Sequence, residues 1–182
     1  MLAANSGADL TKINICYGAL GAGTEPARLT VDGVESIRLA AKYKLPFDVV
    51  TNEELCGVPA HKAFAGMLIV ANLALALGAE PILQPLFCYS PEVMIDGKMK
   101  DNYVDFNAAK IMALQEIVTA PIWPGAPIGF LTQTEERVQS SVSTGLHAAL
   151  ASSLGVDAIS IASADEAYSP GPALGRRNGD GD

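Results

Sequence analysis

The feature that most constrains the fold is a regular alternation of short apolar segments with longer, helix-patterned stretches. Strands that alternate with helices at these lengths predict βα units and a parallel sheet. In such folds, functional side chains gather at the carboxyl ends of the strands. We predict strands that begin near Ile13, Phe47, Ile82, Ile128 and Ala158, and helices over residues 26–44, 59–77, 105–118 and 135–154.

The length of the chain limits how many such units it holds. Its 182 residues fit one domain, whereas a complete (β/α)8 barrel usually needs roughly 250 residues. We therefore expect an α/β fold of parallel βα units, either about half of a TIM-type (β/α)8 barrel or a small open α/β sheet. The domain would span residues 1–172, and residues 173–182 would form a flexible tail. The open strand edges of a half barrel would need a partner subunit or the missing half of the barrel.

Composition and charge argue against several kinds of partner and site. The net charge of −8 and the lack of a Lys/Arg cluster argue against nucleic acid. The apolar stretch 64–77 is too short to cross a bilayer, and no signal peptide is visible. The three cysteines are widely spaced and lack a CxxC pair, so we expect buried, reduced thiols, no metal site and a cytoplasmic protein.

Polar residues follow three of the predicted strands and are the candidates for chemistry. Tyr17 closes the first strand, Glu53 follows the second and Glu166 follows the fifth, while His61 lies in the first turn of the second helix. Carboxylates and histidine at strand ends can accept substrate hydroxyls or transfer protons. The alternatives are a solvated acidic loop at Glu53 and a structural role for His61.

The glycine-rich segment Gly18–Gly23 follows the first predicted strand and precedes a helix. Its backbone amides, at Gly21 and Gly23 among others, are candidates to bind a phosphate or carboxylate. Its spacing differs from the dinucleotide-binding motif, and a plain βα turn is the alternative. An unrelated small α/β enzyme with a phosphate at this loop is one hypothesis for the function.

The fourth unit, LTQTEERVQSSVSTGLHAALASSLGVDAISIASADEAYSPGP, resembles the late barrel units of adenosylcobalamin-dependent carbon-skeleton mutases. These include the methylmalonyl-CoA mutase type and the large chain of glutamate (methylaspartate) mutase. The shared pattern is an Ala-rich helix, Leu154-Gly155, a strand, Glu166-Ala167 and Pro170. VPAHKAFAGMLIVANLALALGAEPI and INICYGALGAG resemble a helix and a Tyr-bearing strand of glutamate mutase, so the similarity spans about residues 13–172.

The resemblance implies part of the catalytic barrel of an isomerase, which rearranges a small carboxylic or amino acid through radicals. Glu166 with Asp165, together with Gly21 and Gly23, would face adenosylcobalamin. Ala162 stands where glutamate mutase has a lysine.

In the same reading, Tyr17 would face the substrate, and Glu53 and His61 would handle protons. The chain lacks the cobalamin signature DxHxxG, so a partner subunit would hold the cofactor. The pattern also resembles corrinoid-dependent methyltransferases of the trimethylamine type. A non-catalytic α/β interaction fragment that oligomerises through its open strand edges is a further alternative.

Overall fold

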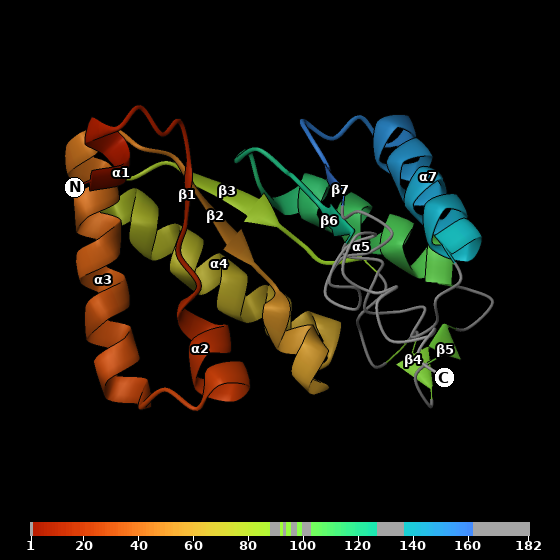
Figure 1. The fold of residues 1–182 in the computed structure, drawn as a ribbon, viewed down its shortest axis with the longest axis horizontal. Helices are drawn as coiled ribbons and strands as arrows, with labels where there is room; N and C mark the ends of the chain where they lie inside the picture. The colour runs from red at the N-terminus through yellow and green to blue at the C-terminus, as the bar shows by residue number, and fades with distance from the viewer. Residues whose placement is uncertain are drawn as a thin grey trace, which may run out of the picture.

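A computed structural model describes residues 2–87, 92, 94–95, 98–99, 103–126 and 137–161 of the chain. It is an α/β protein built around a small parallel sheet (Figure 1). The sheet consists of β1 (Thr11–Lys12), β2 (Phe47–Val50) and β3 (Pro81–Gln84) in that order. Thr11 pairs with Phe47, which in turn pairs with Pro81.

Parallel pairing extends beyond β3 to later segments of the chain. Isolated parallel bridges join Leu83 to Ile122 and Leu86 to Gly125. The next strand, β6 (Gly125–Ala126), pairs in parallel with β7 (Ser160–Ile161). The strand segments β1, β2, β3, β6 and β7 therefore follow one another in space in chain order.

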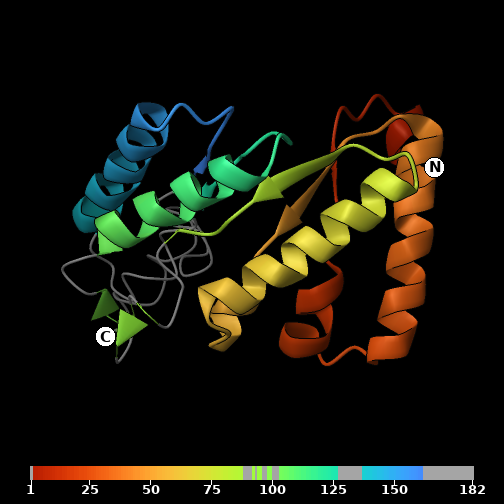
Figure 2. The same cartoon turned by 180° about the vertical axis from the view of Figure 1, so that it is seen from behind.

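A helix separates each of these segments from the next, as the alternation predicts. The helices are α3 (Pro26–Tyr43), α4 (Ala60–Ala76), α5 (Tyr103–Ile117) and α7 (Arg137–Ser153). Figure 2 shows α4 and α5 lying across one side of the strands. The core lies between helices and strands, and its large fully buried side chains include Ile37, Phe47, Met67, Leu83, Ile111 and Leu114.

The strand predicted near Ile13 is present as β1, but its predicted extent to Tyr17 is wrong, because β1 ends at Lys12 and the chain is helical over α2 (Ile15–Ala22). A short apolar run is ambiguous between strand and helix. Asn14 begins this helix by accepting a hydrogen bond from the Tyr17 N–H at 3.3 Å. Gly23 ends it with a φ of 65°, a left-handed conformation that favours glycine.

The glycines of α2 allow close packing and do not form a loop. A Cβ at Gly18 would lie 2.8 Å from Leu29, and a Cβ at Gly21 would lie 2.3 Å from the Tyr17 ring. A Cβ at Gly33 of α3 would lie 2.4 Å from Ile15. The prediction of a glycine-rich βα loop at Gly18–Gly23 is therefore wrong.

Smaller elements complete the described part of the chain. The 3₁₀ helix η1 (Asn52–Cys56) follows β2, α1 (Leu2–Asn5) precedes β1, and β4 (Met94–Ile95) pairs antiparallel with β5 (Lys98–Met99).

Cys56 is exposed, which corrects its predicted burial. The predicted strand start at Ile128 and the tail 173–182 lie outside the described residues. None of the described helices has the length and apolar character to cross a membrane.

Candidate functional site

A buried ion pair lies just beyond the carboxyl end of β2. Lys110 Nζ of α5 is 2.8 Å from Glu54 Oε2, and the two side chains are 5% and 0% exposed. Lys110 also donates to the Leu86 carbonyl, and Thr51 Oγ1 donates to Glu54 Oε1 at 2.6 Å. The Leu86 N–H donates to Thr51 Oγ1 at 2.9 Å. We call Thr51, Glu54, Leu86 and Lys110 the closed cluster.

The closed cluster joins β2, α5 and the segment after β3. The Lys110 ammonium lies 5.7 Å from the centre of the Phe64 ring and 5.8 Å from that of Phe106, so aromatic faces also stabilise the cation. Both oxygens of Glu54 accept hydrogen bonds from Lys110. A buried ion pair needs hydrogen bonds to its charged groups to offset the cost of removing them from water. The main role of the closed cluster is therefore to hold these elements together.

Glu53, the neighbour of Glu54, is oriented differently. It is 5% exposed, its Oε2 atom has no hydrogen-bond partner among the described residues, and its carboxyl interacts with the Cys16 thiol of α2. Burial raises the pKa of Glu53, and the nearby Glu54 carboxylate adds to that rise. Burial, followed by repulsion from Glu53, raises the pKa of the Cys16 thiol to about 11. The thiol is therefore neutral near pH 7, and the Glu53 carboxyl binds a proton more tightly than a solvated glutamate does.

A second polar cluster crosses the strands and is partly open to solvent. Lys12 Nζ of β1 is 3.2 Å from Asp48 Oδ2 of β2 and donates to Gln84 Oε1 of β3 at 3.0 Å. Gln84 Nε2 donates to Ser160 Oγ of β7 at 3.1 Å. We call Lys12, Asp48, Gln84 and Ser160 the open row, because the Lys12 side chain is 52% exposed.

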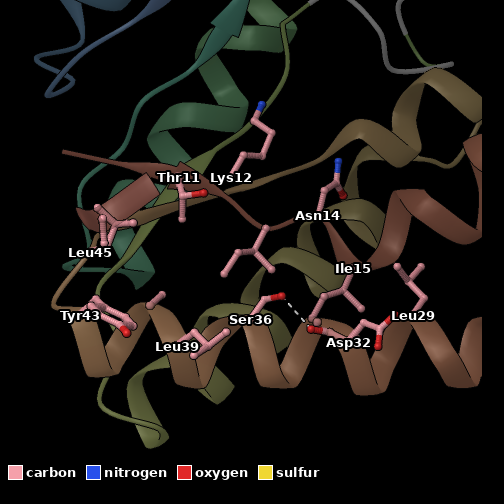
Figure 3. A pocket seen from close by; sticks show the side chains of 14 residues that line it. Thr11, Lys12, Asn14, Ile15, Leu29, Asp32, Ser36, Leu39, Tyr43 and Leu45 are labelled. Atoms are coloured by element: carbon pink, nitrogen blue, oxygen red, sulfur yellow. Dashed lines mark hydrogen bonds between the residues drawn. The ribbon is translucent and has the colours of Figure 1, made fainter. Parts of the chain in front are cut away.

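The open row lies on the face of the strands that points away from α3. Figure 3 shows Lys12 extending from β1 to the side opposite the α3 side chains of Ser36 and Leu39. Since side chains alternate along a strand, Asp48 and Val50 share that face, and Phe47 and Val49 take the other. Burial raises the pKa of Asp48, and the Lys12 ammonium opposes that rise. The row therefore pairs a buried carboxylate with an accessible cation.

A pocket of about 340 Å³ lies on the other side of β1, between this strand, α3 and the start of α2 (Figure 3). Leu29, Leu39 and Tyr43 contribute much of its apolar lining. Asp32, at its margin, forms an ion pair with Arg28 across 3.3 Å. Its lining also includes the polar residues Thr11, Asn14, Ser36 and Tyr43, which come from three different segments, and we assign the pocket no chemistry.

The structure places the described residues that the sequence proposed as a site in three different elements. Tyr17 is in α2, with its ring over Gly21, and does not close a strand. His61 is exposed at the second position of α4, whereas Glu53 is buried beyond β2. Asp165 and Glu166 lie outside the described residues. Of the proposed catalytic residues, Glu53 is the buried one, beside the closed cluster and in contact with Cys16 of α2.

Sequence reasoning missed the four residues of the open row and also Lys110. Asp48 and Gln84 are polar residues inside the apolar strands FDVV and PILQ, and polar residues at such positions are a signal of function or of a buried partner. Lys110 stands among the apolar residues of α5, where the same signal applies. Lys12 and Ser160 carry no comparable signal.

The chain matches no protein-family model, and no curated protein is similar enough to count as a relative. Within the described residues, no three His, Cys, Asp or Glu side chains converge as ligands for a metal ion. The two clusters beside β2 are therefore the basis for assigning a function.

Proposed function

We propose that this chain forms part of the (β/α) barrel of a cobalamin-dependent carbon-skeleton mutase that acts on a small carboxylic or amino acid. The barrel portion would span residues 1–172. A partner subunit would supply the cobalamin-binding site, and the enzyme would be an oligomer. The free thiols of Cys16 and Cys56 are compatible with a cytoplasmic location.

The observation that carries the proposal is the order of the parallel segments. Strands β1, β2, β3, β6 and β7 succeed one another in chain order with a helix between each pair. Successive βα units of this kind build the wall of a barrel. The open row spans four of these strands on the face away from α3, where a barrel has its interior. The sequence resemblance to the mutases adds the reaction class.

In this proposal the chain's own residues bind the substrate and exclude water from it. The open row would bind polar groups of the substrate, and Glu53 would hold a proton at Oε2. Tyr17 and His61 remain proposals as substrate-facing and proton-handling residues. Tyr17 follows Cys16, whose thiol interacts with Glu53, and His61 is exposed at the start of α4. Bound adenosylcobalamin would supply the radical chemistry, which must be shielded from solvent.

Gly21 and Gly23 lie exposed at the carboxyl end of α2, and not in a βα loop. The space beside Gly21 holds the Tyr17 ring, and Gly23 adopts the left-handed conformation that ends the helix. Their role as cofactor contacts stays a proposal. Asp165 and Glu166, the other proposed contacts, lie outside the described residues.

A spectral titration of adenosylcobalamin with the full-length chain and its cobalamin-binding partner tests the proposal. We expect a shift of the corrinoid absorption that needs both chains. An unchanged spectrum with both chains present would rule the proposal out.

A second candidate function is a non-catalytic interaction module. The specific observation in its favour is that β1 and β7 each pair on one side only within the described residues, and Ile161 of β7 is 51% exposed. Unpaired edges favour association with another chain. Measurement of the mass in solution by light scattering tests this candidate, and a folded monomer would contradict it.

A further inference from the structure

The open row has a fixed direction of hydrogen bonding. An ammonium group only donates hydrogen bonds, so Gln84 turns its carbonyl oxygen to Lys12 and its NH₂ group to Ser160. The Ser160 hydroxyl thus accepts from Gln84. Its own proton is then available to donate elsewhere.

Lys12 also retains a donor. Its ammonium carries three N–H groups, and within the described part of the chain two are directed at Asp48 and Gln84. The third has access to solvent, because the side chain is 52% exposed. Two donors, one on Lys12 and one on Ser160, therefore flank the Gln84 amide.

We propose that Lys12 Nζ and Ser160 Oγ bind a carboxylate group, with Asp48 and Gln84 holding the two donors in place. The inference deepens the proposed function, on which its catalytic meaning rests, by naming the substrate group that the described residues bind. Lys12 and Ser160 bond the two ends of one amide group, that of Gln84, and each has a donor for one oxygen of a carboxylate.

The charge of the row favours a carboxylate over a phosphate. Asp48 neutralises Lys12, so the row offers two directed donors with little net positive charge. A phosphate dianion would be repelled by the Asp48 carboxylate, and among the described residues no arginine or second lysine hydrogen-bonds to the row. A carboxylate carries half that charge.

Titration of the ¹⁵N-labelled full-length chain with acetate, followed by NMR at constant ionic strength, tests the inference. We expect saturable shifts of the amide signals of Lys12, Gln84 and Ser160. Lys12→Met should weaken acetate binding at least about tenfold, since it removes a charged donor, and Ser160→Ala about threefold. Lys12→Arg should retain most of the binding.

Three controls keep the test decisive. Lys42→Met removes an exposed lysine of α3 and should bind acetate as the wild type does. Neutral acetamide should give no saturable shifts, and circular dichroism should show that each variant is folded. The inference is overturned if phosphate saturates the row and acetate does not, if acetate gives no saturation, or if Lys12→Met binds like the wild type. The titration needs no cobalamin, so acetate binding without a corrinoid shift would reject the mutase and leave the carboxylate site intact.

Discussion

The closed cluster and the open row both join a lysine to a carboxylate beside β2, yet they differ in access to solvent. Lys110 and Glu54 are 5% and 0% exposed, whereas Lys12 and Asp48 are 52% and 7% exposed. In the closed cluster the lysine donors go to Glu54 and the Leu86 carbonyl. In the open row, donors remain for a ligand.

The difference shows why an ion pair alone does not identify a functional site. A buried pair whose hydrogen-bonding groups are satisfied within the protein stabilises the arrangement of its elements, and its loss affects folding. A half-exposed pair contributes little to stability but can bind a solute. The two clusters should therefore respond in opposite ways to substitution.

The largest effect is expected for Lys110→Met. Removing this cation leaves Glu54 buried without its partner, which should cost about 3–5 kcal/mol of the free energy of unfolding. Urea denaturation measures the loss. Lys42→Met, on the exposed surface of α3, should change stability by less than about 0.5 kcal/mol. An equal loss of unfolding free energy in the two variants would contradict the stabilising role of the closed cluster.

Thr51→Val should cost about 1–3 kcal/mol, because the Leu86 N–H and Glu54 lose a buried hydrogen-bond partner. The valine keeps nearly the same shape, so the loss reports the hydroxyl. Thr30→Val removes an exposed hydroxyl of α3 and is the matched control. Thermal unfolding compares the two, and a Thr51→Val protein as stable as the control would remove Thr51 from the cluster.

Lys12→Met should cost about 1 kcal/mol, less than Lys110→Met, because the Lys12 side chain is 52% exposed although its partner Asp48 is buried. Urea denaturation beside Lys110→Met gives a direct comparison. A loss as large as that of Lys110→Met would mean that the open row is structural, and the contrast between the clusters would fail.

The smallest effect is a pH dependence at Glu53. Burial raises the pKa of this carboxyl, so the folded protein binds its proton more tightly than the unfolded chain does. Stability should then fall as pH rises from the unfolded pKa through the folded pKa. Glu53→Gln should remove this pH dependence, so the variant should become more stable relative to the wild type as pH rises. Glu35→Gln, at an exposed residue of α3, should show the pH dependence of the wild type. Urea denaturation at a series of pH values measures these free energies of unfolding, and the same pH dependence in wild type and Glu53→Gln would contradict the assignment.

The four long helices were predictable from the sequence, and α2 was not. Helices α3 and α4 have long periodic patterns with proline near their starts, and such signals are local. The segment ICYGALGA is too short for its hydrophobic period to distinguish a strand from a helix. In the structure its glycines lie in the helix, with Leu29 packed beside Gly18 and the Tyr17 ring beside Gly21. The end of β1 was therefore predicted wrongly, and with it the position of Tyr17.

The sequence by itself determined the βα alternation, the parallel direction of the strands and the position of Glu53 beyond β2, because periodicity and turn residues act over neighbouring residues. Only the tertiary structure decided that Glu54 is neutralised by Lys110, 56 residues away, and that Gln84 links Lys12 to Ser160. Charges and hydrogen-bond donors have no preferred spacing along a chain. Their partners are fixed when the strands align and water is excluded from one cluster but not from the other.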